Sequence, residues 1–219
     1  MNKQKISTRE LTTLAMLTAI AYALVCTVRI PIVLFLKYEP KDVVITIGGF
    51  LMGPMAVLIS SSIVALIEMF TISDTGIIGC IMNFLSTCAF AVPAAFVYKR
   101  RHTMAGAIAG LAVGTITMVA TTLLWNYLIT PLYMENTTRQ QVAEMLIPLF
   151  LPYNLLKTAL NGTITMLLYK SVASALRAAK LLPPAETPTN GKKVLPVTIL
   201  SQLVLAALIL ALLVWKGII

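Results

Sequence analysis

The chain has 219 residues, of which 58% are hydrophobic and 11% charged, and its mean hydropathy is +0.90. Soluble globular proteins carry about 25% charged residues, so this composition excludes a soluble domain and indicates an integral membrane protein. The net charge of +9 is explained by membrane topology and requires no nucleic-acid partner.

Apolar runs long enough to cross about 30 Å of hydrocarbon predict an all-α bundle of six transmembrane helices, with a further transmembrane helix appended at the C-terminus. The predicted segments, in chain order, are 11–30, 43–60, 61–72, 77–98, 105–131, 146–173 and 194–215. The Gly53-Pro54 pair leaves the boundary between the second and third segments open. We divide the chain into a six-helix membrane domain at 1–180, a linker at 181–193 and an additional helix at 194–219.

Lysine and arginine are distributed unequally over the two sides that this topology defines. With the N-terminus inside, the inner face receives eleven of the 17 and the outer loops five, while Lys157 lies within the membrane. Because positive charge favours the cytoplasmic side, the sequence predicts a cytoplasmic N-terminus.

Two stripes of small residues predict close helix packing. Ala15, Ala19 and Ala23 recur every four residues in the first segment, and three glycines from Gly106 to Gly114 do so in the fifth. Small residues at that spacing let helix backbones approach each other closely in lipid. We expect the glycine stripe to pack within the bundle. The alanine stripe either packs there too or forms a docking face for another membrane protein.

Lys157 interrupts an otherwise apolar helical segment. A charged side chain at that depth costs at least ~2.5–3.5 kcal/mol, so it usually faces a cavity, a ligand or a polar partner. Asn154 and Asn161, at positions i−3 and i+4, lie on the same helix face. This face carries amide groups and one cation, which suits a polar solute with carbonyl edges. The alternative is a lysine that snorkels to the outer headgroups.

Two other regions are expected to converge on Lys157. The first outer loop, 35–42, contains Tyr38 and Glu39, and the proline that follows Glu39 favours an ordered loop. Asn126 near the end of the fifth segment and Tyr153 near the start of the sixth lie at matching depth. An unsatisfied amide in lipid is costly, so Asn126 should face inward. For the surrounding aromatic residues taken alone, an interfacial belt is the favoured interpretation.

The fourth segment adds Asn83 and Phe84, and Asn83 either lines the same cavity or bonds across helices. For Glu68 the same two alternatives remain, a position in the cavity wall or a structural contact between helices. The three cysteines lie in apolar runs without a Cys/His cluster, which supports neither a disulfide framework nor a metal site. No pair of acid and base residues lies at one depth, so we expect no enzymatic activity and no cofactor.

This layout resembles the substrate-binding (S) components of energy-coupling factor (ECF) vitamin transporters, and most closely the riboflavin-specific one. The resemblance covers roughly residues 8–180. The matching strings are LAMLTAIAYAL, FLKYEPKDVVITIGGFLMGP, NYLITPLY and PYNLLKTALNGTITMLLYK, the last being the most specific.

The resemblance implies a high-affinity riboflavin-binding subunit in a prokaryotic cell membrane. Such a subunit docks on a transmembrane coupling protein and two ATPases, whose ATP turnover reorients it to release its substrate inside. Asn126 would pair with the uracil-like edge of riboflavin and Lys157 would donate to the ring, while Asn154 and the first loop would take the ribityl hydroxyls. Two alternatives stay open: an S component for thiamin, biotin or a folate, and a membrane scaffold without transport.

Overall fold

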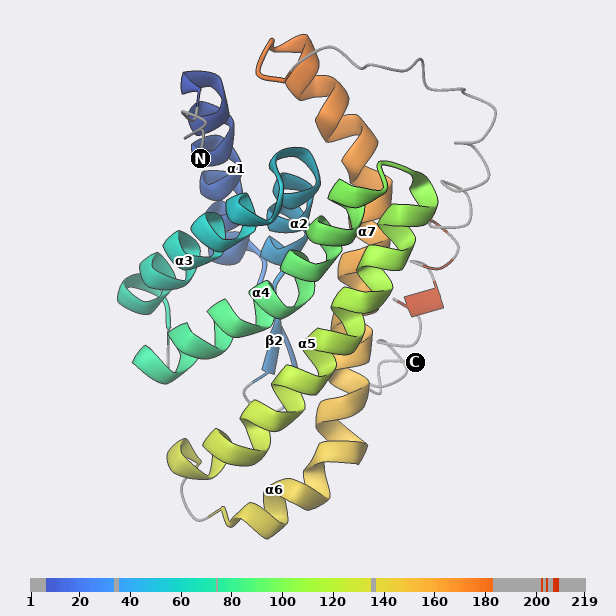
Figure 1. Ribbon diagram of the computed structural model, residues 1–219. Helices are drawn as coiled ribbons and strands as arrows, with labels where there is room; N and C mark the ends of the chain where they lie inside the picture. The colour runs from blue at the N-terminus through green and yellow to red at the C-terminus, as the bar shows by residue number, and fades with distance from the viewer. Residues whose placement is uncertain are drawn as a thin grey trace, which may run out of the picture.

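The computed structural model describes residues 7–33, 36–73, 75–134 and 137–182, together with positions 202, 204, 207 and 208. Within these residues the chain forms a helical bundle with one small β-hairpin (Figure 1). The elements are α1 (Thr8–Thr27), β1 (Ile30–Val33), β2 (Leu36–Tyr38), α2 (Lys41–Met52), α3 (Pro54–Thr71), α4 (Gly76–Arg100), α5 (Met104–Tyr133), α6 (Arg139–Met145), the π-helical turn η1 (Leu146–Phe150) and α7 (Leu151–Ala178). The predicted linker and last helix lie almost wholly outside the described residues.

The first helix ends earlier than the sequence predicts. A capping box between Ser7 and Glu10 starts α1, and the backbone turns extended at Val28. The chain then enters an antiparallel hairpin in which Ile30 pairs with Tyr38. The prediction of helix to Ile30 was wrong because the apolar run continues without interruption through β1, which hides the change from helix to strand.

The boundary between the second and third helices lies at Gly53, the break that the Gly53-Pro54 pair had left open, and not at residues 60 and 61. Gly53 has a φ of +92°, a conformation that strongly favours glycine. Pro54 then occupies the first turn of α3, where its missing N–H leaves no intrahelical hydrogen bond unmade. As a result α3 has 18 residues rather than the short third segment that we expected.

The glycine stripe packs inside the bundle, as predicted. A Cβ on Gly110 would lie 2.7 Å from the carbonyl oxygen of Ala94, and one on Gly114 would collide with the carbonyl oxygen of Phe90. Both contacts are with α4. Glycine on α5 therefore sets how closely these two antiparallel helices approach.

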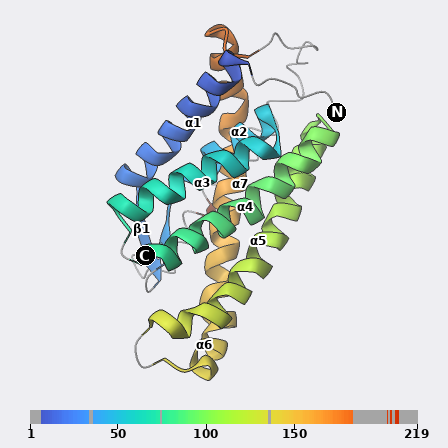
Figure 2. The ribbon, with the colours of Figure 1, turned by 60° about the vertical axis from the view of Figure 1, so that its left-hand side comes forward.

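Four described helices are long and apolar enough to cross a membrane: α1, α3, α4 and α5 as far as Leu132. A mostly helical membrane fold is thus supported, with a small β-hairpin that the sequence did not predict. The predicted count of six transmembrane helices and an appended one stays a prediction. The helix α7 has 28 residues and is about 42 Å long at 1.5 Å per residue. It is less apolar than the other four because one face carries Asn154, Lys157 and Asn161. Figure 2 shows α7 running beside α5, with α6 joining their ends.

The start of α1 and the end of α7 lie at one end of the bundle, and the hairpin lies toward the other. The hydroxyl of Thr13, near the start of α1, lies 3.4 Å from the carbonyl oxygen of Leu181, just beyond the end of α7. The basic end of α4, with Lys99 and Arg100 in its last turn, points toward this end, because α4 runs obliquely but in the same general direction as α7 (Figure 1). The hairpin lies toward the opposite end.

Candidate functional site

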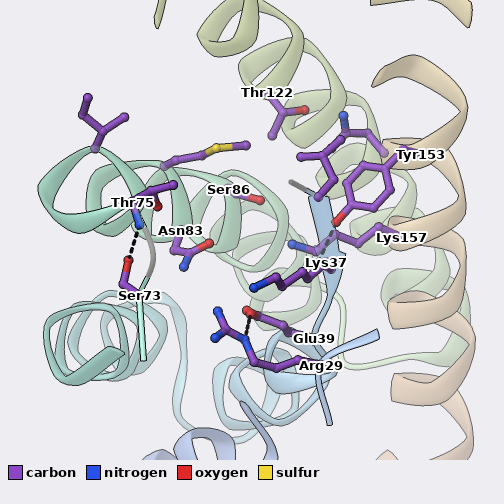
Figure 3. A pocket seen from close by; sticks show the side chains of 15 residues that line it. Arg29, Lys37, Glu39, Ser73, Thr75, Asn83, Ser86, Thr122, Tyr153 and Lys157 are labelled. Carbon is purple, nitrogen blue, oxygen red and sulfur yellow. Dashed lines mark hydrogen bonds and ion pairs between the residues drawn. The ribbon is translucent and has the colours of Figure 1, made fainter. Parts of the chain in front are cut away.

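A cavity of about 180 Å³ lies beside the hairpin (Figure 3). Its walls come from the hairpin, the α3–α4 connection, α4, α5 and α7. The lining residues are Arg29, Leu36, Lys37, Glu39, Ser73, Thr75, Ile78, Gly79, Met82, Asn83, Ser86, Thr122, Tyr153, Asn154 and Lys157.

Five of the eight predicted substrate-site residues line this cavity: Glu39, Asn83, Tyr153, Asn154 and Lys157. The Tyr153 hydroxyl donates a 2.8 Å hydrogen bond to the carbonyl oxygen of Lys37, which ties α7 to the hairpin. The first loop and the sixth predicted helix therefore meet, as the sequence indicates. Figure 3 shows Glu39 on the hairpin side and Lys157 on the α7 side.

The other three predicted residues, Tyr38, Phe84 and Asn126, belong to the described part of the chain but not to the lining. The hydroxyl of Tyr38 is buried and finds no hydrogen-bond partner among the described residues. Asn126 is fully buried within α5: its amide nitrogen donates to the Thr122 carbonyl at 2.8 Å, and its amide oxygen accepts from the Thr130 hydroxyl at 3.0 Å. Both ends of this amide are thus satisfied locally.

Lys157 faces inward and makes an ion pair. The residue is 8% exposed, and its Nζ lies 3.3 Å from Oδ2 of Asp42. Asn154 and Asn161, on the same face of α7, are buried as well. The snorkelling alternative does not describe this structure, because the ammonium group is neutralised inside the bundle.

A second set of charges, here called the ionic cluster, lies beside this pair and consists of Arg29, Glu39, Lys41 and Glu68. Lys41 Nζ lies 2.9 Å from Oε2 of Glu39 and 2.5 Å from Oε2 of Glu68. Arg29 Nε lies 2.8 Å from Oε1 of Glu39. The amide of Asn83 donates to Glu68 at 3.3 Å, so Asn83 both lines the cavity and bonds across helices.

The charges of the cluster and of the Lys157 pair balance. Three cations face three carboxylates, and buried charges are tolerated when they are paired in this way. Burial alone would raise the pKa of Glu39, but Lys41, Lys157 and Arg29 outweigh burial and lower this pKa to about 2. The carboxylate of Glu39 is therefore ionised at neutral pH.

Sequence reasoning missed two buried contributors, Lys41 and Asp42. Both were placed in the first outer loop and not among the site residues, but they open α2 and are 2% and 0% exposed. The only sequence feature that could have indicated their burial is the high density of charged residues directly before an apolar helix. Their partners, Glu68 and Lys157, are 27 and 115 residues away by number, so local sequence gives no indication of the pairing.

Chemically, the lining offers two ammonium groups, a guanidinium group, two amides, hydroxyls and a carboxylate beside apolar side chains. Groups of this kind bind a polar solute through several hydrogen bonds while apolar walls hold its rings. Within the described residues, no cluster of three His, Cys, Asp or Glu side chains is placed to hold a metal ion.

Comparisons with known proteins agree with this architecture. The sequence model of the family described as "ECF transporter, substrate-specific component" matches residues 9–169. The chain is 28% identical over 178 residues to the riboflavin transporter RibU of Staphylococcus aureus (strain TCH60), covering 77% of this chain and 93% of that protein. It also matches a solved structure described as "Structure and mechanism of the S component of a bacterial ECF transporter", with a TM-score of 0.63, 28% identity and coverage of 77% and 98% of the two chains.

The family match spans well over half of the chain, and the structural match is to a member of the same family. The predicted resemblance is thereby confirmed. This chain, a multi-pass helical membrane protein, belongs to the family of substrate-specific (S) components of ECF transporters.

Proposed function

We propose that this chain binds riboflavin one-to-one in the cavity beside the hairpin and delivers it into the cell. The observation that carries the proposal is the buried Lys157 beside Asn154 on the cavity wall. A curated relative with 28% identity is a riboflavin transporter, which favours this vitamin over the other substrates considered.

The chemistry of riboflavin suits the lining. The vitamin has a flat, largely apolar tricycle, one edge with alternating carbonyl acceptors and an N–H donor, and a ribityl chain with several hydroxyls. The Lys157 ammonium would donate to a ring carbonyl or nitrogen. The Asn154 amide and the Glu39 carboxylate would bind ribityl hydroxyls, and Tyr153 and Met82 would contact the tricycle.

Binding requires the cavity to widen. Pockets that enclose ligands of this size have volumes of about 300–1,000 Å³, whereas this cavity has about 180 Å³. Leu36 and Lys37 of the hairpin line it next to α7, and Figure 3 shows Lys37 beside Tyr153 and Lys157. Asn126 lies one turn beyond the lining residue Thr122, so it would reach the ring edge after exchanging its Thr130 contact for the ligand.

The direction of transport and the partners belong to the same proposal. With the N-terminus inside, the hairpin end and its cavity face the outside, where the vitamin is captured. Ala15, Ala19 and Ala23 are all exposed on α1, which supports a flat docking face for the transmembrane coupling subunit. Two ATPases bound to that subunit would then drive release of riboflavin inside.

Titration of the purified chain with riboflavin, followed by quenching of flavin fluorescence without ATP, tests the proposal. We expect saturable one-to-one quenching. Absence of quenching, together with tight binding of thiamin, biotin or a folate, would transfer the chain to another vitamin while leaving its family intact. Absence of binding to all of them would favour the non-transporting scaffold.

A further inference from the structure

Asp42 is fully buried and lies behind Lys157, outside the lining of the cavity. Its Oδ2 forms an ion pair with the Lys157 ammonium at 3.3 Å and accepts a hydrogen bond from the Asn161 amide, also at 3.3 Å. Its Oδ1 accepts from the Thr87 hydroxyl at 2.7 Å. One carboxylate therefore joins three helices: α2, which carries it, α4 and α7.

The carboxylate is held more firmly than the ammonium that it pairs with. Asp42 has a short side chain in the first turn of α2, where the helix dipole favours a negative charge, and Thr87 and Asn161 fix both of its oxygens. Lys157 has four rotatable bonds and could place its ammonium at many points. The ion pair with the Asp42 carboxylate selects one position of the ammonium group from these.

We infer that Asp42 is a positioning residue for the Lys157 ammonium, holding it at the wall of the cavity so that its remaining N–H groups point to the ligand. The inference rests on the proposed function, since it assigns Lys157 a contact with riboflavin. It adds a residue that has no ligand contact of its own. The ion pair orients the ammonium before the ligand arrives, which lowers the ordering cost of binding.

A double-mutant cycle on riboflavin affinity tests this. Asp42→Asn keeps the shape of the side chain and removes its charge, so it should weaken binding about tenfold, within the range of coupling found inside polar networks. In the Lys157→Met background, Asp42→Asn should have less than about a twofold effect, because there is no ammonium left to place.

A matched control separates positioning from general loss of buried polar contacts. Thr18 and Ser60 form a buried 2.8 Å hydrogen bond between α1 and α3, and neither residue lines the cavity. Thr18→Val should change affinity by less than about twofold in both backgrounds. If Asp42→Asn weakens binding by the same factor with and without Lys157, or leaves the affinity unchanged, the positioning role is wrong.

Failure of the proposed riboflavin binding can be distinguished from failure of the role assigned to Asp42. If the unmodified chain does not bind riboflavin, the substrate assignment fails, and the same four proteins are compared for thermal unfolding in detergent. From the Asp42–Lys157 ion pair we still expect each single variant to unfold at a lower temperature than the wild type. The decrease in unfolding temperature of the double variant should be smaller than the sum of the two single decreases. Strictly additive losses would overturn the inference without reference to any ligand.

Discussion

Replacement of Lys41 by methionine should destabilise the protein severely, although this lysine lies outside the cavity lining. Its side chain is 3% exposed, and its Nζ bridges Glu39 at 2.9 Å and Glu68 at 2.5 Å. Methionine fills similar volume but leaves both buried carboxylates without this cation. Glu39 keeps Arg29 and Glu68 keeps Asn83, so some of the loss is offset.

Removing one partner from a buried ion pair typically costs about 3–5 kcal/mol, and we expect Lys41→Met to fall in that range. The free energy of unfolding in detergent, measured by titration with a denaturing detergent, gives the value. Lys170→Met on the exposed surface of α7 is the control and should change it by less than about 0.5 kcal/mol. Adding Glu68→Gln to Lys41→Met should recover part of the loss, because one unpaired carboxylate is removed. If Lys41→Met and Lys170→Met unfold with the same free energy, the burial argument for the cluster is refuted.

Four further predictions follow from other contacts. Lys157→Met should weaken riboflavin binding by about 1.5–3 kcal/mol, the range for a hydrogen bond to a charged group; an unchanged dissociation constant would remove Lys157 from the site. Ala19→Trp should block co-purification with the coupling subunit while riboflavin binding by the isolated chain survives, and the reverse pattern would make the alanine stripe internal packing. Gly110→Leu should force α4 and α5 apart and lower the free energy of unfolding by about 1–3 kcal/mol or more, whereas an unaffected unfolding curve would contradict the close packing. The pKa of Glu39 is lowered from 4.5 to about 2, so its stabilising contribution is complete above about pH 4.5 and disappears as the pH falls towards 2; thermal unfolding of wild type and Glu39→Gln should therefore differ at pH 7 and converge in acid.

The features that sequence predicted best are those encoded locally. Lys157 stands out because charge in an apolar helix is costly, and its burial follows from that cost. The glycine stripe of α5 likewise carries its packing role in its own spacing. In the same way, the high overall hydropathy was enough to predict a helical membrane fold.

Features that depend on distant partners were not predictable. The sequence alone suggested that Lys157→Met would relieve desolvation and leave the fold intact. The structure pairs Lys157 with Asp42, so the same substitution would leave a buried carboxylate without its cation, and we expect it to destabilise the protein instead. Nothing near either residue in the sequence indicates this pairing, because the loop carrying Asp42 offered several charges and no means of choosing among them.

The hairpin and the Asn126 amide illustrate two other limits. The strand Ile30–Val33 is as apolar as the helix before it, so hydropathy could not separate them. Asn126 was correctly expected to be buried, but burial did not determine its partners. A backbone carbonyl and the Thr130 hydroxyl on its own helix satisfy the amide in this structure, an outcome as compatible with the sequence as a cavity contact.

We expect a neutral flavin to bind beside Lys157 at the hairpin end of the bundle. Equilibrium titration of the full chain with riboflavin, run in parallel on the wild type and on Lys157→Met, tests it most directly. We expect saturable one-to-one quenching for the wild type and a dissociation constant about 10- to 150-fold higher for the variant, which corresponds to a loss of about 1.5–3 kcal/mol in binding free energy. Equal dissociation constants for the two proteins, or no quenching by the wild type while another vitamin binds tightly, would contradict it.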